Sequence, residues 1–175
     1  AGSAVYIEDS GTSVSRLDVN ASAADDVNFV FGYDPASGTD WAGQSFTVNG
    51  GAYIDTIKVF LMTIGAPADN VNIAIEADSA GSPSGTPLGS GSIAAASLSG
   101  TMTEKTITLS VGTDLVAGTY WVTLKRSGAT STINYYGDRR STADDYSGGG
   151  AATHGNAGWS ATSANEWSVE LLYTS

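Results

Sequence analysis

The stretch Val71-Asn72-Ile73-Ala74-Ile75-Glu76-Ala77 decides the fold class. Its odd-numbered residues are all apolar, whereas Asn72 and Glu76 are polar. Successive side chains of a β-strand point to opposite faces of the sheet. The alternation therefore predicts a strand with one face in a core and one face in solvent.

Three other segments of the chain alternate in the same way. They are residues 106–111, the set Tyr120, Val122 and Leu124, and the set Trp167, Val169, Leu171 and Tyr173. Turn-forming Gly, Pro, Asn and Asp residues separate these segments, for example at residues 65–70 and 79–87. No long stretch has the 3.6-residue period of a helix, and only residues 94–98 favour a short helical turn. We predict an all-β fold, an antiparallel β-sandwich of jelly-roll-like type.

Residues 57–64 are apolar on both faces of the predicted strand. Ile57, Val59 and Leu61 form one face, and the side chains at positions 60, 62 and 64 are Phe, Met and Ile. Such a strand is expected to be covered on both sides. The second cover is either a loop of the same chain or a neighbouring subunit, and the sequence does not separate the two.

The chain divides into two regions. Residues 41–175 carry the alternating segments and form the predicted sandwich domain, and residues 1–40 are an N-terminal arm or edge strands. Residues 127–164 are rich in Gly, Asp and Tyr and are predicted to be loops. Long loops on compact scaffolds often carry function, so we expect contacts with ligands there.

The charge and composition exclude several classes of partner. Seven basic and eighteen acidic residues give a net charge of -11, which disfavours nucleic acid and anionic membranes as partners. The chain contains no cysteine, so disulfides, thiol nucleophiles and cysteine-bound zinc are absent from it. No apolar run reaches the ~20 residues of a membrane span. The many Asp side chains are suitable ligands for hard cations such as calcium.

The order of motifs resembles a widespread jelly-roll module. The residues that carry the resemblance are 44–48, 57–61, 70–78 with Gly81-Ser82-Pro83, Leu98, 106–110, 117–122 and 134–136. The module is similar to those of bacterial choice-of-anchor secreted proteins and of phage virion and tail-associated proteins. The resemblance spans residues 41–173 and implies a scaffold that serves different functions. No anchoring segment follows Tyr173, which favours a virion or appendage subunit over a wall-anchored protein.

The sequence carries no constellation of catalytic residues. His154 is the single histidine and lies among Gly and Ala residues, and there is no G-x-S-x-G turn. HExxH, GxGxxG and P-loop motifs are also absent. Glu166 and Glu170 lie on or next to one strand and are explained as solvated residues rather than as a glycosidase pair. We therefore predict that the protein is not an enzyme.

Two groups of residues are candidates for binding. Aromatic residues at predicted loops or strand ends are suited to stacking on sugar rings, and they are Trp41, Tyr135, Tyr136, Tyr146 and Trp159. The alternative for each is that it closes the open end of the sandwich. Asp138, Asp144 and Asp145 form an oxygen-rich cluster that is the best candidate for calcium, although it lacks EF-hand spacing. The alternative is that these side chains cap turns.

Two hypotheses follow for function. The first is a non-catalytic structural subunit of a virion or extracellular appendage, of the decoration or fibre-associated type, which binds copies of itself or another structural protein. The second is a carbohydrate-binding module that recognises surface glycans through its aromatic residues. Both place the protein in a virion, outside the cell or at a cell surface, with calcium as the one expected cofactor.

Overall fold

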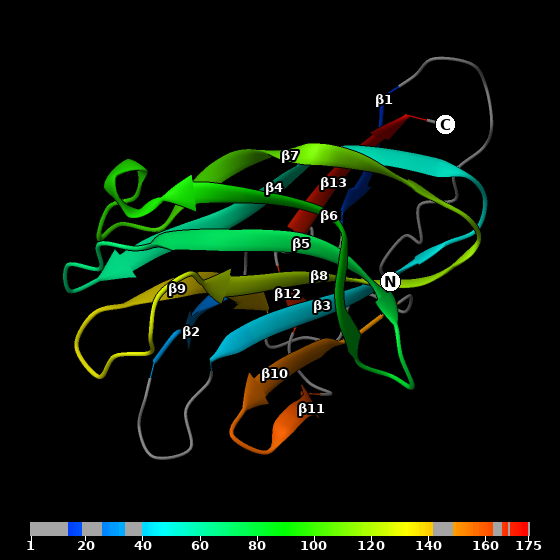
Figure 1. Cartoon of the computed structure of the whole chain (residues 1–175). Coiled ribbons are helices and arrows are strands. Elements are labelled where there is room, and N and C mark those ends of the chain that lie inside the picture. Colours follow the sequence, from blue (N-terminus) through cyan, green and yellow to red (C-terminus); the bar gives the residue numbers. More distant parts are fainter. Residues whose placement is uncertain are drawn as a thin grey trace.

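The computed structural model describes residues 14–18, 26–33, 40–141, 149–162, 166–167 and 169–174, and it shows two packed antiparallel sheets (Figure 1). One sheet contains, in spatial order, β11 (Gly158–Thr162), β10 (Ala151–Gly155), β3 (Trp41–Val48), β8 (Gly118–Arg126), β5 (Asn70–Asp78) and β6 (Pro83–Ala94). The other contains β1 (Val14–Asp18), β13 (Val169–Thr174), β4 (Ala52–Ile64), β9 (Tyr135–Ser141) and β12 (Glu166–Trp167), with β2 (Asp26–Phe31) paired to β9 and β7 (Thr103–Leu115) paired to β4. The predicted all-β antiparallel sandwich is confirmed.

One hydrophobic core fills the space between the sheets. Val71, Ile73 and Ile75 of β5 are fully buried in it, as their alternation predicted. Val122 and Leu124 of β8 are buried beside them. Burial of each such side chain contributes about 1.5–3 kcal/mol, so the inward faces of these strands dominate the stability of the sandwich.

Strand β4 has different environments on its two faces. Ile57 and Leu61 are fully buried in the core, whereas Phe60, Met62 and Ile64 face outward and are half-buried. The guanidinium of Arg139 lies 4.7 Å from the centre of the Phe60 ring. Within the described residues, the outward face of β4 is thus only partly covered.

Two strands from the first 40 residues belong to the seven-stranded sheet. β1 pairs with β13, and β2 pairs with β9 over six register positions. The side chain of Phe31, at the end of β2, is fully buried and stacks on Tyr136 at 5.7 Å. The described parts of residues 1–40 therefore lie on sheets of the same chain.

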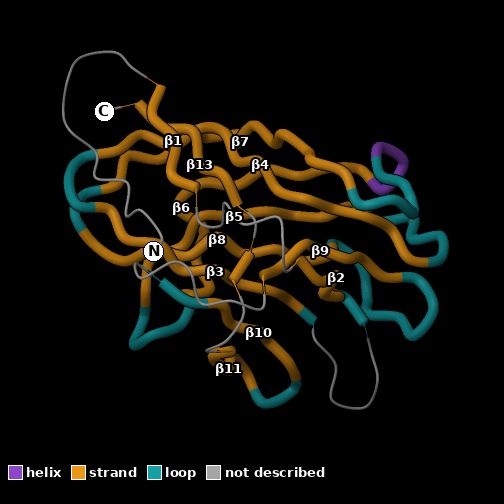
Figure 2. Tube along the Cα trace, turned by 180° about the vertical axis from the view of Figure 1, so that it is seen from behind, coloured by secondary structure: helices purple, strands orange, loops and turns teal. Residues whose placement is uncertain are grey.

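The expected helical turn is confirmed, and two predictions of irregular structure are wrong. A short 3-10 helix, Ala95–Ser97, lies in the connection from β6 to β7 at one end of the sandwich (Figure 2). Residues 127–164 were predicted as loops but contain β9, β10 and β11. Residues 83–87 were predicted as a turn but form the first part of β6. These strands consist largely of small and polar residues, so they lack the apolar alternation that predicts a strand. Their pairing with β3, β4 and β5 stabilises them instead.

Candidate functional site

The outward face of the six-stranded sheet carries rows of side chains that cross the strands. Five residues are successive cross-strand partners, and in order they are Trp159, His154, Trp41, Lys125 and Asn72. Their neighbours along the strands, such as Ala42, Leu124 and Ile73, are buried in the core. The five therefore face away from the core and form the first row.

The second row lies two residues further along each strand and consists of small side chains. Its members, again as cross-strand partners, are Ala152, Gly43, Thr123, Ala74 and Ser90. Small residues leave space above the sheet. Thr123, Ala74 and Ser90 of this row form the floor of a groove whose first wall contains Trp41, Lys125 and Asn72.

The third row forms the opposite wall. Trp121 pairs with Glu76, and Glu76 pairs with Pro87. The first part of β6 curls over the sheet and crosses in front of β8 and β3 (Figure 1). The amide of Gly85 in this part of β6 donates a hydrogen bond of 2.5 Å to Glu76 Oε2, which holds the curled segment against the sheet.

The groove between these walls has a volume of about 640 Å³. Lys125 and Trp121 are four residues apart on β8, which separates the two walls by about 13 Å along the strand. From β3 to β6 the groove crosses three strand spacings, a length of about 14 Å. Its lining includes Trp41, Asn72, Ala74, Glu76, Gly85, Pro87, Ser90, Ser92, Thr108, Ser110, Thr123 and Lys125.

A cluster of aromatic rings lies at the β3 end of the groove, and Trp41 is the member of this cluster that lines the groove. Trp41 stacks on His154 with ring centres 4.2 Å apart and lies 6.1 Å from Trp159. Trp159 is also 6.5 Å from Trp121, which is only 4% exposed. A Cβ atom at Gly43 would lie 3.0 Å from Trp159 Cζ3 and 3.3 Å from Trp121 Cε3, so glycine permits the two indoles to cross the floor.

Glu76, which lines the groove, and Asp78, two residues further along β5, are already hydrogen-bonded within the protein. Glu76 accepts from the Thr123 hydroxyl at 3.0 Å as well as from Gly85. Asp78 accepts from the indole N–H of Trp121 at 2.7 Å and from the Gly81 amide at 3.1 Å. These bonds fix the wall and leave few carboxylate lone pairs for a ligand.

The first row also contains a histidine and a lysine. His154 Nδ1 lies 3.8 Å from Asp40 Oδ2, which is an ion pair when the imidazole is protonated. Lys125 Nζ lies 4.2 Å from the centre of the Trp41 ring. Both His154 and Lys125 contact the Trp41 ring, so Trp41 positions these two side chains in the wall.

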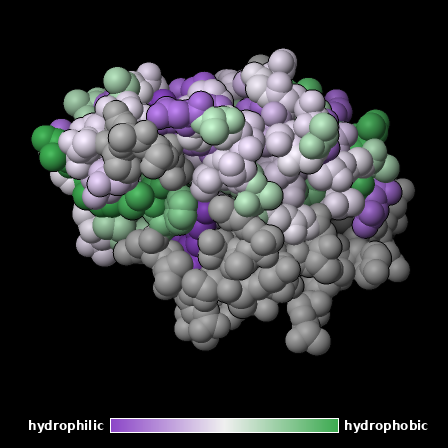
Figure 3. Space-filling view, turned by 90° about the horizontal axis from the view of Figure 1, so that it is seen from below, coloured by the Kyte–Doolittle hydropathy of each residue, from purple (hydrophilic) through white to green (hydrophobic). Residues whose placement is uncertain are grey.

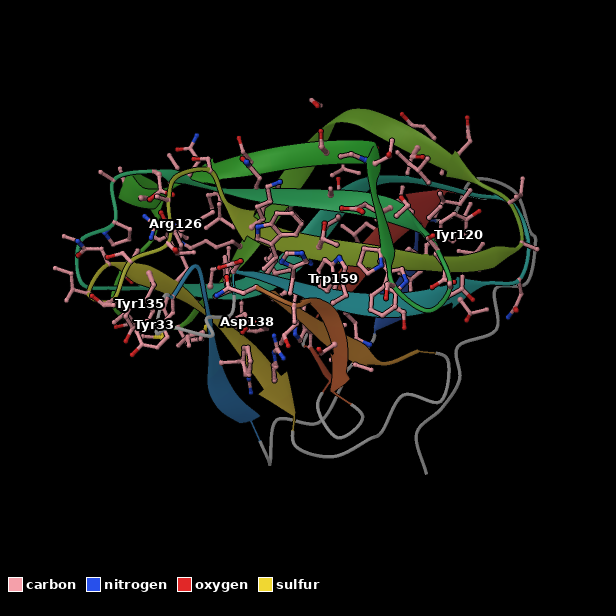
Figure 4. All side chains as sticks on the ribbon, turned by 60° about the horizontal axis from the view of Figure 1, so that its bottom comes forward. Tyr33, Tyr120, Arg126, Tyr135, Asp138 and Trp159 are labelled. Atoms are coloured by element: carbon pink, nitrogen blue, oxygen red, sulfur yellow. The ribbon has the colours of Figure 1, made fainter. Side chains whose placement is uncertain are left out.

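The aromatic residues that the sequence proposed lie at separate places. Trp41 and Trp159 belong to the cluster described above, and each lies at a strand end, at the start of β3 and of β11. Tyr135 contacts Tyr33 with ring centres 4.7 Å apart at one end of the molecule, whereas Trp159 lies near its middle (Figure 4). Tyr146 lies outside the described residues.

The prediction for Tyr136 needs correction because its side chain is fully buried. Its hydroxyl donates to the backbone carbonyl of Asp69, and burial raises the pKa of this hydroxyl to about 12. The residue is part of the core and offers no surface to a ligand. Tyr136 instead fits the alternative given above for these aromatic residues, in which the side chain fills the interior of the sandwich.

Asp138 is a poor cation ligand in this structure. It is buried, and Arg140 Nε lies 3.3 Å from its Oδ2 atom. Burial raises the pKa of the Asp138 carboxyl, and the adjacent guanidinium would repel a metal ion. Asp144 and Asp145 lie outside the described residues, and the part of the chain that the structure describes holds no group of three His, Asp or Glu suited to a metal. Calcium binding stays a prediction.

Sequence reasoning missed Trp121, Glu76 and Lys125 as members of one site. A signal for Trp121 was present, because it is a large aromatic residue in the polar phase of a strand whose core phase is Tyr120, Val122 and Leu124. The register that joins Lys125 to Trp41 and Glu76 to Trp121 comes only from the paired strands.

Comparison with known proteins gives a likeness of fold. No protein-family model and no curated protein matches the chain, so the choice-of-anchor and phage resemblance is not confirmed. A clostridial cysteine protease, Cwp84, solved after propeptide cleavage, matches 92% of the chain with a TM-score of 0.56 and 8% identity. The cysteine protease and lectin-like domains of Cwp84, a surface layer associated protein of Clostridium difficile, match 88% with a TM-score of 0.52 and 9% identity. The chain spans 40% and 37% of those structures.

Among the described residues, no helix is long and apolar enough to cross a membrane.

Proposed function

We propose that this chain is a non-catalytic carbohydrate-binding module that acts outside the cell or at a cell surface. One observation carries the proposal. The outward face of the six-stranded sheet holds a groove of about 640 Å³ that is lined at one end by Trp41, whose ring contacts those of His154 and Trp159.

The chemistry of the groove suits a short sugar chain. Sugars present apolar C–H faces together with hydroxyl groups, so they bind where aromatic rings lie beside hydrogen-bonding side chains. Trp41 lines the groove, and the part-exposed Trp159 lies beside it, with the two ring centres 6.1 Å apart. Asn72, Ser92 and Lys125 supply polar groups along the lining. The volume falls within the range of about 300–1,000 Å³ that is usual for ligand pockets.

The solved structures support the proposal as a likeness. One of them includes a domain described as lectin-like, in a protein associated with a surface layer. The same proteins are described as cysteine proteases, and this chain contains no cysteine that could supply the corresponding nucleophile. Of these two descriptions, we therefore take only the lectin-like one as support for the proposal.

Glycan-array screening followed by calorimetric titration of the ligands found tests the proposal. Ala74→Phe places a ring on the floor of the groove and is expected to abolish binding. Trp159→Ala is expected to weaken it at least about tenfold, which corresponds to a loss of about 1.4 kcal/mol. Tyr135→Ala removes an aromatic residue that lies outside the groove lining and should leave the affinity unchanged.

Two outcomes would contradict this assignment. The first is silence of the array together with unchanged tryptophan fluorescence during polysaccharide titration. The second is a glycan that binds Ala74→Phe as well as the wild type but no longer binds Tyr135→Ala, because the site would then lie near Tyr33 and Tyr135. Circular dichroism and thermal melts of each variant establish that it is folded.

A second candidate is association with copies of the same chain or with another structural protein. The observation in its favour is the half-buried outward face of Phe60, Met62 and Ile64 on β4. Apolar surface is also visible at one end of the molecule from below (Figure 3). The comparisons give no support to a virion subunit, so we place this candidate second.

A further inference from the structure

We propose that the groove selects sugars that carry an anionic group, such as a carboxylate, sulfate or phosphate ester, and that Lys125 binds this group. The inference rests on the proposed function and concerns the class of glycan.

The ammonium group of Lys125 lies over the indole ring of Trp41. His154 on β10 and Lys125 on β8 contact the same indole, each at 4.2 Å from a ring centre. Because β10 and β8 lie on opposite sides of β3, the two groups cover opposite faces of the Trp41 ring. A sugar therefore cannot stack on Trp41 unless it displaces one of them. In this structure Trp41 positions the ammonium group at the edge of the groove.

Lys125 has no carboxylate partner among the residues that the structure describes. Lys58, Arg126 and Arg140 each lie within 3.3 Å of a carboxylate oxygen, in ion pairs with Glu170, Asp69 and Asp138. No carboxylate of the described residues lies within ion-pair distance of Lys125 Nζ. In a chain with eighteen acidic and seven basic residues, an unpaired ammonium at the wall of a groove is a site for an external anion.

Glu76, on the opposite wall of the groove, is far from Lys125, and its carboxylate oxygens already accept hydrogen bonds. Glu76 lies in the row of Trp121, about 13 Å along the strands from the row of Lys125. This separation is well beyond ion-pair distance, so Glu76 does not form an ion pair with Lys125. Both oxygens of Glu76 already accept hydrogen bonds, from Thr123 and Gly85. The groove thus has one cationic wall that is available to a ligand.

Lysine suits this role chemically. Its ammonium group is a point charge with three rotatable donors, and it does not require the planar, bidentate partner that arginine favours. Carboxylate, sulfate and phosphate groups on a sugar all satisfy it. The same row then binds the uncharged part of the sugar chain through Asn72, the cross-strand partner of Lys125, and through Ser92, the partner of Asn72.

The test compares matched pairs of polymers that differ only in charge. Oligogalacturonate is compared with its methyl ester, dextran sulfate with dextran, and phosphorylated mannan with the same mannan after phosphatase treatment. Each pair isolates one anionic group. Wild-type protein is expected to bind at least one acidic member about tenfold more tightly than its neutral partner, with an affinity that falls as salt rises.

Three variants assign the effect to one side chain. Lys125→Gln should reduce the preference for the acidic polymer to near unity while the neutral polymer still binds, and Lys125→Arg should retain the preference. Lys105→Gln is the matched control, because it changes the net charge equally and Lys105 Nζ contacts the Ser97 carbonyl outside the groove lining. This control should behave as the wild type.

The outcomes separate this inference from the proposed function. If acidic and neutral polymers bind the wild type equally and Ala74→Phe abolishes both, the groove binds glycans and the selectivity assigned to Lys125 is wrong. If Lys125→Gln keeps the full preference, or Lys105→Gln loses it, the inference is also overturned. If no polymer binds, or if binding ignores Ala74→Phe, the proposed function itself fails and the inference fails with it.

Discussion

Replacement of Asp69 by alanine is expected to destabilise the sandwich at neutral pH. The carboxylate of Asp69 accepts hydrogen bonds from Arg126 Nε at 2.9 Å, from Arg126 Nη2 at 2.5 Å and from the Gly128 amide at 2.8 Å. The guanidinium also donates to the Gly32 and Asn134 carbonyls at 3.3 Å and 2.7 Å. One arginine thus connects the end of β8 to the residues that follow β2 and precede β9.

The magnitude follows from the burial of this pair. The Asp69 and Arg126 side chains are 18% and 9% exposed. A fully buried pair costs about 3–5 kcal/mol when one partner is removed, and this pair is slightly more exposed, so we expect about 2–3 kcal/mol for Asp69→Ala. In a domain of this size 1 kcal/mol shifts Tm by about 2–4 °C, so the expected loss is about 4–12 °C.

The effect should also depend on pH. Burial alone raises the pKa of Asp69, but hydrogen bonds from Arg126 and Gly128 outweigh it, and the folded pKa lies below the ordinary value of 3.8. For a carboxyl with a lowered folded pKa, the contribution to stability is complete above the unfolded pKa and is lost as pH falls through the folded pKa. The difference in stability between wild type and Asp69→Ala should therefore be constant from pH 7 to about pH 5 and shrink below pH 3.8.

Calorimetric melts at a series of pH values measure both parts of the prediction. Asp55→Ala is the control, because the Asp55 carboxylate is exposed and accepts a hydrogen bond from the hydroxyl of the adjacent Thr56. The reasoning is refuted if Asp69→Ala melts with the wild type at pH 7, or if its deficit persists unchanged well below pH 3.8.

Three further predictions concern the core, the metal and self-association. Tyr136→Phe removes the hydrogen bond to the Asp69 carbonyl and should lower the free energy of unfolding by about 1 kcal/mol in urea denaturation, and an unchanged midpoint would show that the bond contributes nothing. Calcium is expected to raise Tm in the wild type and not in a variant with Asp144→Asn and Asp145→Asn, and equal melts with calcium and with chelator would exclude the site. Mass photometry is expected to show assemblies that Met62→Glu disperses, and a wild-type monomer at high concentration would rule out self-association through β4.

The candidate site was only partly predictable. Trp41 and Trp159 were selected as aromatic residues beside polar ones, and the structure places them 6.1 Å apart. Tyr135 and Tyr136 are adjacent in sequence and were indistinguishable as candidates, although one faces outward and the other is in the core. The phase of β9 sets this difference, and its sequence of Tyr, Gly, Asp and Arg has no apolar alternation from which the phase could be read.

The sequence by itself determined the fold class, because the period-two pattern of Val71, Ile73 and Ile75 is a local property that requires one buried face on each strand. It also determined what the chain lacks, which is cysteine chemistry and the histidine motifs of zinc hydrolases. Only the tertiary structure decided where a ligand would bind. Cross-strand register brings residues from six strands into rows, and register depends on hydrogen bonds between segments far apart in the chain, as between Trp41 and Lys125. Those long-range pairings, and the curl of β6 over the sheet, create a groove that no local pattern encodes.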